Sequence, residues 1–438
     1  MKAFVGCDHH QTAMKMRKTL LILLMLLSLG LYAQHYPVCD NINYKDDVRT
    51  VLLYAGGDQT AEPIITLGNV MGGLTLSFDV LGNEANVLNY TLIHCTHDWQ
   101  PTDMQRINYV SGYESGRIDD YSYSVNTLID YVNYRLVFPN EDMVPLLSGN
   151  YLLVVYGSDM SENNLYFTRR FMVLDEKAHV GATVPRYTDD LTLSDTHQQL
   201  NVKATLNDIM SGNVQDYANL TVRQNGRWDN AVVGLKPSYI YPDHISFEHD
   251  PLTVFEASNQ FIRFNTSNFY FQSENLADIR QTNDYYIIDI ATCESRARKP
   301  YVTYEDSHGK KVIYIANEGR ETATEADYAW VNFFLRWDAP LTHEDMYIMG
   351  AINDWNFNET NRMTYDYKLH GYICSMLLKQ GYYNFMFATV DRDSYQVSTE
   401  KTAGNFWETN NQYQLYFYYY NAIKGYDELV GYSVVNSH

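Results

Sequence analysis

Cysteine, basic residues and long apolar runs are all scarce in this chain of 438 residues. Five cysteines are too few for the dense disulfide framework of a small secreted fold. The 32 basic residues are outnumbered by 53 acidic ones, and the formal net charge is −21. A chain this acidic, without clusters of Lys or Arg, lacks the positive surface that binds nucleic acid or anionic lipid. After residue 31 no apolar run is long enough to cross a bilayer as a helix.

Catalytic motifs are missing as well. His343-Glu344 resembles the start of a zinc-protease motif, but Tyr347 stands where that motif needs its second His. The GYESG segment at 112–116 is not a nucleophile elbow, because Glu114 occupies the Ser position. No phosphate-binding loop is present, and no dinucleotide-binding glycine motif follows a predicted strand. We therefore expect a protein without catalytic residues and without a cofactor.

One short segment does contain residues of the types that bind metals. His94, Cys95, His97 and Asp98 lie within five positions of one another. Neighbouring residues on a strand point to opposite faces, so His94 and Cys95 could not both bind one ion. We expect no metal site here, with Cys95 facing the core and Asp98-Trp99 beginning a turn.

The N-terminal residues have the features of a targeting segment. Lys15, Arg17 and Lys18 precede an apolar run, Leu20–Leu31, that is too short to span a membrane. We expect residues 1–33 to form a signal peptide that is cleaved after Ala33, which would release a soluble exported protein.

Four cysteines would remain after cleavage, namely Cys39, Cys95, Cys293 and Cys374. Cys95 and Cys374 lie in apolar runs, where a buried free thiol is the ordinary state. Export would also permit disulfides. The sequence leaves open whether Cys39 pairs with Cys95, or Cys293 with Cys374.

What the chain has in abundance is Tyr, with 39 residues, and short segments of alternating polarity. Leu74, Leu76, Phe78 and Val80 alternate with polar residues, a period of two that places one face of a strand in a core. Many such segments are separated by Gly, Asn and Asp, which is typical of antiparallel sandwiches. The predicted fold class is all-β, with three consecutive immunoglobulin-like or early-set-like β-sandwiches at residues 36–175, 190–325 and 326–438.

The segment Met346–Phe387 within the third predicted sandwich has a pattern of its own. Its G-x-x-N-x-W turn and later L-x-x-G-x-Y strand resemble the early-set sandwich of glycogen- and starch-binding modules. An exposed Trp355 on that turn could stack on a sugar ring, and Tyr372 and Tyr382 could extend the platform. The alternative is that the Trp355 indole covers the core.

A second resemblance extends over nearly the whole sequence after residue 36. The segments 94–113 and 118–155, the Gln224–Asp229 hairpin and the closing Asp427–Gly431 resemble motifs of the type IX secretion system plug protein family. Thr102 and Val125 depart from the usual motif residues, and SNQFIRFN at 258–265 departs from the usual acidic segment. The residues that match the family motifs are His94, Cys95, Asp98, Trp99, Pro101, Asp120, Tyr121, Asn126, Thr127, Phe138, Pro139, Asn140, Gly149, Asn150, Tyr151, Asn225, Asp427, Glu428, Leu429 and Gly431.

This resemblance implies a function without catalysis. A plug protein of this family closes the periplasmic opening of an outer-membrane translocon β-barrel of the SprA/Sov type while no substrate is being exported. The implied location is the periplasm, at the inner face of the outer membrane. The alternative is a periplasmic or surface glycan-binding protein that uses the C-terminal sandwich. A third interpretation is a set of accessory domains from an enzyme that has lost its catalytic partner.

Overall fold

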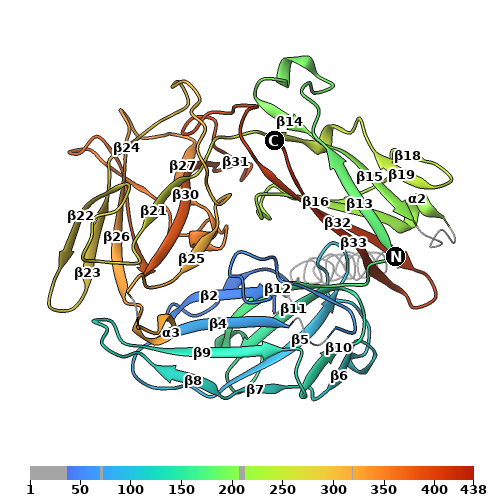
Figure 1. Cartoon of the computed structure of the whole chain (residues 1–438), viewed down its shortest axis with the longest axis horizontal. Coiled ribbons are helices and arrows are strands. Elements are labelled where there is room, and N and C mark those ends of the chain that lie inside the picture. Colours follow the sequence, from blue (N-terminus) through green and yellow to red (C-terminus); the bar gives the residue numbers. More distant parts are fainter. Residues whose placement is uncertain (1–36, 70–72, 207–212, 318) are drawn as a thin grey trace, which may run out of the picture. The chain divides into compact units, whose positions relative to one another are not determined.

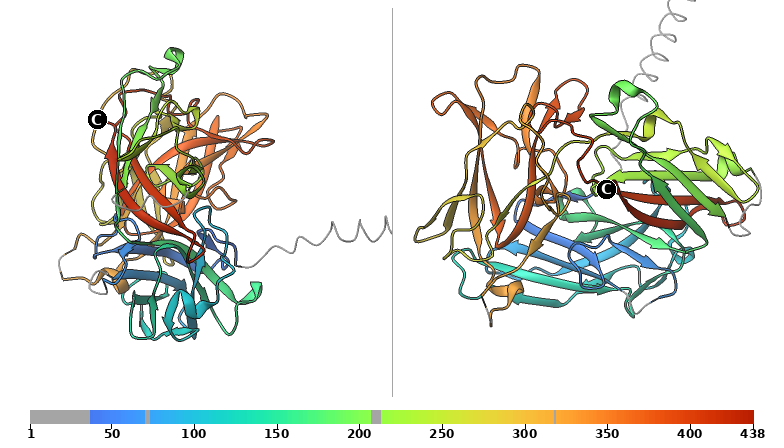
Figure 2. Two further views of the ribbon diagram at one scale, coloured as in Figure 1. Left: turned by 90° about the vertical axis from the view of Figure 1, so that its right-hand side faces the viewer. Right: turned by 45° about the horizontal axis from the view of Figure 1, so that its top comes forward.

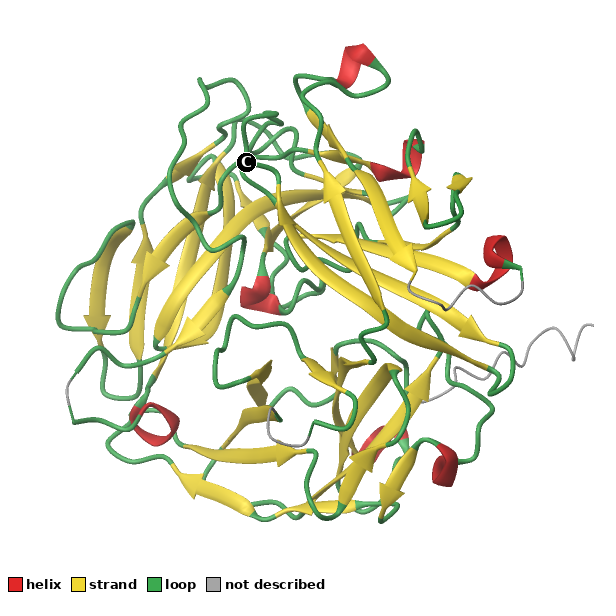
Figure 3. Cartoon of the chain, turned by 45° about the vertical axis from the view of Figure 1, so that its right-hand side comes forward, coloured by secondary structure: helices red, strands yellow, loops and turns green. Residues whose placement is uncertain are grey.

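The computed structural model describes residues 37–69, 73–206, 213–317 and 319–438, so the predicted signal peptide lies outside the described residues. Strands provide most of the regular structure (Figure 3). The helices that the described ranges contain are single turns: α2 (Val214–Tyr217), α3 (Thr322–Glu325), and the 3-10 turns η1 (Arg106–Asn108), η2 (Glu162–Asn164), η3 (Leu191–Leu193), η4 (Pro251–Thr253) and η5 (Ala351–Asn353). The predicted all-β class is confirmed. In these ranges no helix is both long and apolar enough for a membrane span.

The first sandwich consists of one mixed sheet, one antiparallel sheet and a short strand pair (Figure 1). One sheet has the order β1 (Ile42–Asn43), β12 (Leu165–Leu174), β11 (Gly149–Tyr156), β5 (Leu88–Cys95), β7 (Gly116–Ile118), with β3 (Ile64–Thr66) parallel to β12. The other sheet has the order β2 (Val48–Ala55), β4 (Leu74–Leu81), β9 (Tyr131–Phe138), β8 (Asp120–Tyr123). The short pair is β6 (Val110–Gly112) with β10 (Met143–Pro145).

The core of this sandwich follows from the alternation in the sequence. Leu74, Leu76, Phe78 and Val80 of β4 are buried in one cluster with residues of β5, β11 and β12. The opposite face of β4 is not simply solvated, because Asp79 is only 1% exposed. Contacts from outside this sandwich therefore cover the outer face of the sheet around Asp79, whereas β8 stays exposed.

The second sandwich is formed by segments from two distant parts of the chain. One sheet has the order β13 (Ala178–Thr183), β15 (Asn201–Leu206), β19 (His244–Phe247), β18 (Tyr239–Ile240). The other has the order β17 (Val232–Leu235), β16 (Ala218–Gln224), β32 (Gln412–Asn421), β33 (Tyr426–Asn436). A short pair joins β14 (His197–Gln199) to β20 (Val254–Glu256).

Strand pairing therefore divides the chain differently from the predicted consecutive domains. Strand β32 pairs with β16 from Ala218↔Tyr419 to Gln224↔Tyr413, so the C-terminal hairpin completes the second sandwich and not the third (Figure 2). The physical reason is that local alternation gives the faces of a strand but not its pairing partner. The predicted third sandwich, residues 326–438, therefore includes β32 and β33, which belong to the second sandwich.

The third sandwich is inserted between β20 and β32. One sheet has the order β22 (Leu276–Gln281), β23 (Tyr286–Ile290), β26 (Tyr328–Arg336), β29 (Gly371–Lys379), β28 (Thr364–Asp366), with β24 (Cys293–Glu294) beside β26. The other sheet is built around β30 (Gly381–Asp391), which pairs with β21 (Ile262–Asn265), β25 (Lys311–Ile313), β27 (Glu344–Met349) and β31 (Val397–Ser398). Both sheets contribute to one buried cluster that contains Val331, Phe333 and Phe385.

Candidate functional site at the junction of the three sandwiches

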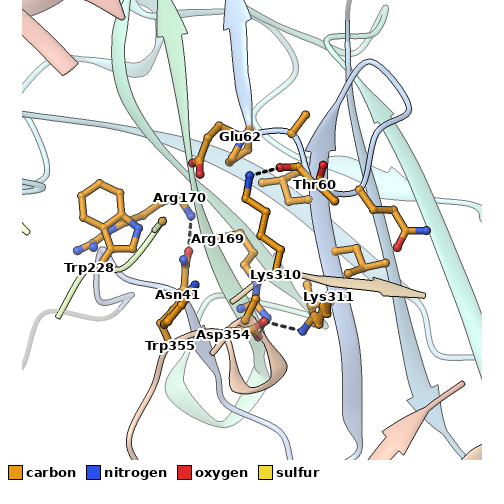
Figure 4. Close-up of a pocket in the computed structure, with 18 of the residues that line it drawn as sticks. Asn41, Thr60, Glu62, Arg169, Arg170, Trp228, Lys310, Lys311, Asp354 and Trp355 are labelled. Atoms are coloured by element: carbon orange, nitrogen blue, oxygen red, sulfur yellow. Dashed lines mark hydrogen bonds and ion pairs between the residues drawn. The ribbon is translucent and has the colours of Figure 1, made fainter. Parts of the chain in front are cut away.

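A cavity of about 170 Å³ is lined by side chains from all three sandwiches (Figure 4). We call this region the junction. Its principal residues are Asn41, Thr60, Glu62, Arg169 and Arg170 of the first sandwich, Arg223 and Trp228 of the second, and Lys310, Lys311, Asp354 and Trp355 of the third. The junction is rich in charge although each sandwich core is apolar.

Asp354 connects the first and third sandwiches through two cations. It follows η5 in a left-handed conformation with φ of 55°, which turns its carboxylate toward β12 and β25. One carboxylate oxygen accepts from Arg169 at 2.9 Å and the other from Lys311 at 2.9 Å. Burial raises the pKa of Asp354, but the two cations outweigh burial and hold the pKa below its usual value. Asp354 is therefore a paired carboxylate in the interior of the junction.

Glu62 connects the first and second sandwiches in a similar way. Its Oε2 lies 3.0 Å from the Arg223 guanidinium, and both side chains are largely buried. The same guanidinium donates to the Tyr416 hydroxyl at 2.8 Å. Because the N–H groups of a planar guanidinium point in fixed directions, Arg223 constrains both the distance and the angle at which Glu62 and Tyr416 can contact it.

Aromatic rings cover the charged groups of the junction. The Arg170 guanidinium lies 4.6 Å from the ring centre of Trp99 and 4.7 Å from that of Trp228. Arg223 lies 4.0 Å from the Trp228 ring on the second sandwich. Cations held against indole rings away from water gain more than exposed ones. Arg170 and Trp99 of the first sandwich thus contact Trp228 of the second sandwich.

A separate buried ion pair lies where the first sandwich meets the third. Lys379 Nζ donates to Asp79 Oδ2 at 2.6 Å, and these side chains are 2% and 1% exposed. The Tyr328 hydroxyl donates to the same oxygen at 2.6 Å, and Asn133 donates to Oδ1 at 2.7 Å. Burial lowers the pKa of Lys379, and Asp79 offsets part of that effect.

The family motif at residues 94–101 meets the closing motif at 427–431. His97 donates its backbone N–H to Asp427 Oδ2 at 3.0 Å, and its Nδ1 lies 3.0 Å from the same oxygen. Tyr418 donates to Asn150 Oδ1 at 2.7 Å close by. At Gly149, with φ of +119°, a side chain would lie 2.9 Å from the Asp427 carbonyl oxygen. Two motifs separated by about three hundred residues are thus parts of one interface.

Glu428, Leu429 and Gly431 hold the connection between the first two sandwiches. Glu428 accepts from Lys177 at 2.8 Å, and the Leu429 carbonyl accepts from the backbone of Asp175 at 3.0 Å. At Gly431 a side chain would lie 3.0 Å from the Ala178 carbonyl oxygen. This motif positions the chain where it leaves β12 for β13.

The motif residues between 118 and 140 lie at the surface, at the contact with the third sandwich, and at the end of β9 in the first sandwich. Asp120 and Tyr121 are exposed on β8. Asn126, with φ of 59°, and Thr127 begin a loop whose next two backbone N–H groups, at residues 128 and 129, donate to Asp327. Phe138 and Pro139 are joined by a cis peptide bond, and Asn140 bonds to Tyr90.

The remaining motif residues lie in turns and in the core. Asp98 accepts from Thr96 in the turn that Trp99, with φ of 64°, shares. Pro101 bridges to Cys95, and Tyr151 is buried with its hydroxyl bonded to the Leu147 carbonyl at 2.9 Å. Asn225 follows β16 and donates to Asn411 at 2.7 Å. β16 and β17 do pair as the expected hairpin, whose loop runs from 225 to 231.

The four potential metal ligands near residue 95 have different neighbours. His94 is fully buried, with Nε2 3.2 Å from the Ser148 carbonyl oxygen, and burial lowers its pKa. Cys95 faces Cys39, and His97 faces Asp427. No cluster of three metal-binding side chains is found in the part of the chain that the structure describes.

The three residues considered for glycan stacking are not brought together on one face. Trp355 packs against Phe261, with ring centres 5.9 Å apart, and lines the junction. Tyr372 is 5% exposed, and its hydroxyl accepts from the Leu341 backbone at 2.7 Å. Tyr382 lies in the opposite sheet, between β21 and β25. The Trp355 indole therefore covers the interior, which was the alternative to a platform.

Sequence reasoning missed most of the junction. Arg169, Arg170, Arg223, Glu62 and Asp354 form no short motif, because they come from four distant parts of the sequence. A signal was available only for the separate ion pair, since Asp79 interrupts an apolar strand segment and Lys379 ends one. A charge in such a place calls for a buried partner. Most charged side chains that line the junction form ion pairs with one another. The junction is therefore suited to holding the sandwiches in one arrangement.

Comparisons with known proteins agree with the motif analysis. The family model for the first domain of the type 9 secretion system plug protein matches residues 48–175. A crystal structure of a hypothetical protein from Parabacteroides merdae ATCC 43184 is 30% identical, with a TM-score of 0.86. The match covers 91% of this chain and 99% of that one. No match was found among curated proteins.

Two other solved structures are much less similar. The BSP domain of a biofilm-associated protein is 8% identical with a TM-score of 0.18, over 92% of this chain and 61% of that one. Three N-terminal domains of the bacteriophage RB49 outer capsid protein Hoc are 10% identical with a TM-score of 0.12, over 88% and 97%. Both TM-scores are too low to show a shared fold. The family model matches the residues of the first sandwich: residues 48–175 of this chain belong to the first-domain family of type 9 secretion system plug proteins.

Proposed function

We propose that this protein is a non-enzymatic periplasmic plug, which closes the periplasmic opening of the type 9 secretion translocon barrel when no substrate is passing. The observation that carries the proposal is the family match over residues 48–175. The family is one of secretion-system plugs and not of enzymes, and the partner it implies is an outer-membrane barrel of the SprA/Sov type.

The contacts at the junction support this proposal on physical grounds. A plug that fills a wide opening has to resist deformation, since a hinge between its domains would open a gap. Here Arg169–Asp354 joins the first sandwich to the third, and Arg223–Glu62 joins it to the second. Each pair needs one orientation of the sandwiches, because an ion pair is strong only when its geometry and hydrogen bonds are complete.

Exposed aromatic side chains are available for reversible contact with a barrel. Tyr270 and Phe271, in the loop between β21 and β22, are 70% and 72% exposed. Aromatic residues are enriched in protein interfaces because they give large contact areas at low cost in conformational entropy. The contact has to give way when a substrate arrives. Each 1.4 kcal/mol of additional affinity would slow release about tenfold at a constant on-rate.

Copurification tests the proposal. The tagged full-length chain is recovered from detergent-solubilised outer membranes, with and without overexpressed cargo. We expect the barrel to copurify, and to do so more in cells without cargo. If the barrel is assembled but never copurifies, the proposal is wrong. Binding to insoluble polysaccharide in a parallel pull-down would favour the glycan-binding alternative instead.

A further inference from the structure

Two buried cysteine thiols face each other at the edge of the first sandwich. The Sγ atoms of Cys39 and Cys95 are 3.4 Å apart. Cys39 is 8% exposed and Cys95 is fully buried. A disulfide bond is about 2.05 Å long, so the two sulfur atoms need to approach by only about 1.4 Å.

The backbone on both sides holds these thiols in place. Cys95 is the last residue of β5 and pairs with Asn150 of β11. The Cys39 carbonyl accepts from Arg170 Nε at 2.9 Å, and the Asp40 carbonyl accepts from Thr168 at 2.6 Å. The segment that leads into β1 is thus fastened along β12, and the contact of the two sulfur atoms follows from that path.

The other two cysteines provide an internal comparison. Cys293 lies opposite Leu335 of β26, whereas Cys374 lies opposite Phe333 of the same strand. Strands β24 and β29 therefore flank β26 on its two sides, about 9 to 10 Å apart at ordinary strand spacing. Cysteines whose Cα atoms are more than about 7 Å apart cannot be bridged without movement of the backbone. This arrangement rules out a bond between Cys293 and Cys374 in the folded chain.

We propose that Cys39 and Cys95 form a disulfide bond in the exported protein, while Cys293 and Cys374 remain thiols. The inference rests on export, which the proposed function also requires. The oxidant is a protein or small-molecule disulfide of the oxidising compartment. Cys39 thiolate attacks it and forms a mixed disulfide, and one thiolate of the oxidant leaves. Cys95 then loses its proton and attacks Cys39 Sγ, which expels the second thiolate. Two protein thiols are oxidised, and the oxidant is reduced to two thiols.

The environment of the pair suits this order of attack. The hydrogen bond from Cys95, aided by the charge of Arg170, lowers the pKa of Cys39. The same contact and burial raise the pKa of Cys95. Cys39 is therefore the better nucleophile toward an external disulfide. The resulting bond would fix the first described residues of the chain to β5 across β11 and β12.

Counting thiols tests the proposal. The full-length chain is exported, denatured and alkylated with and without prior reduction, and its intact mass is measured. We expect two alkylated cysteines without reduction and four with it, and peptide mapping should recover Cys39 linked to Cys95. A chain with C293S and C374S should keep that link, whereas C39S and C95S should each leave every remaining cysteine free to react.

A second experiment tests the disulfide bond independently of export and of the plug function. The chain without residues 1–33 is purified under reducing conditions and treated with oxidised glutathione. Formation of the Cys39–Cys95 link is expected here too. Four reactive thiols in both the exported and the glutathione-treated protein would overturn the proposal. Loss of barrel copurification with the link intact would refute the plug function alone.

Discussion

Lys379 Nζ lies 2.6 Å from Asp79 Oδ2 in a contact from which water is almost entirely excluded. The two residues are 300 positions apart and belong to the third and first sandwiches. The Asp79 carboxylate accepts hydrogen bonds from Lys379, Tyr328 and Asn133. A charge pair of this kind stabilises one docking geometry, since each partner left alone would be a buried charge without compensation.

Removal of one partner should destabilise the protein strongly. We expect Lys379→Met to lower the free energy of unfolding by about 3–5 kcal/mol, because Asp79 would stay buried without its cation. The double variant D79L/K379M should recover much of that loss. Urea unfolding followed by tryptophan fluorescence measures both.

The matched control for this prediction is an exposed ion pair. Arg117 and Asp119 are 59% and 70% exposed, and an exposed pair contributes about 0–1 kcal/mol. Arg117→Met should therefore change stability little. A cost for Lys379→Met no larger than that of Arg117→Met would contradict the role given to the buried pair.

Acid should weaken the contact between the first and second sandwiches. Burial raises the pKa of Asp427, but hydrogen bonds from His97 outweigh it, and the pKa is lowered. A lowered pKa means that the folded state favours the carboxylate. The contribution of the Asp427 carboxylate to folding stability is complete above the unfolded pKa of about 3.9 and is lost as the pH falls below that value. Burial raises the pKa of Asp306 and of Asp327, which act in the opposite direction.

Because Asp306 and Asp327 act in the opposite direction, the test measures the difference in stability between each variant and the unchanged protein at each pH. We expect Asp427→Asn to cost about 1–3 kcal/mol at pH 7 and to lose that difference progressively below about pH 4. Asp119→Asn serves as the exposed control. An Asp427→Asn cost that is the same at pH 7 and pH 3 would show that the carboxylate charge is not what stabilises this contact.

Gly149 should tolerate no side chain. Its φ of +119° is unfavourable for other residues, and an added Cβ would lie 2.9 Å from the Asp427 carbonyl oxygen and 3.1 Å from His94 Nε2. We expect Gly149→Ala to cost about 1–3 kcal/mol. Gly181 of β13 is a matched site with nothing within 4 Å, where Ala should be neutral or stabilise by up to about 1 kcal/mol. Equal melting temperatures for the two variants would be inconsistent with close packing at Gly149.

The sequence predicts the strands better than their partners. Alternation correctly places Leu74 to Val80 in a core and indicates an all-β fold. It misassigns the segment 413–420, because β32 is buried on both faces. Tyr413, Leu415, Phe417 and Tyr419 face the core of the second sandwich. Tyr416 and Tyr418 bond to Arg223 and Asn150. A run of aromatic residues without polar alternation carries no information about which strand lies beside it.

The contacts between the sandwiches illustrate the same limit for sites. The motif residues around His97 and Asp427 are visible in the sequence only as separate patterns, and nothing in either pattern indicates that they touch. Arg169 and Asp354 are 185 positions apart and belong to no motif. Charged pairs between distant segments depend on domain docking, which local periodicity does not encode.

The exposed aromatic pair in the β21–β22 loop should contribute to barrel contact. We expect Y270S/F271S to fold normally, since both side chains are largely exposed, and to recover less barrel in copurification. Ile423, 99% exposed in the β32–β33 hairpin of the second sandwich, provides the control variant Ile423→Ser. Full barrel recovery with Y270S/F271S would exclude this loop from the contact.

The most direct measurement of the central claim is outer-membrane permeability in three strains. A barrel that exports folded proteins leaves a hole unless something closes it. Deletion of the gene for this protein should therefore make cells sensitive to large antibiotics that intact outer membranes exclude. Deletion of the barrel gene as well should restore resistance, because the hole is then gone. Unchanged sensitivity in the single deletion, with the barrel still assembled, would contradict the plug function.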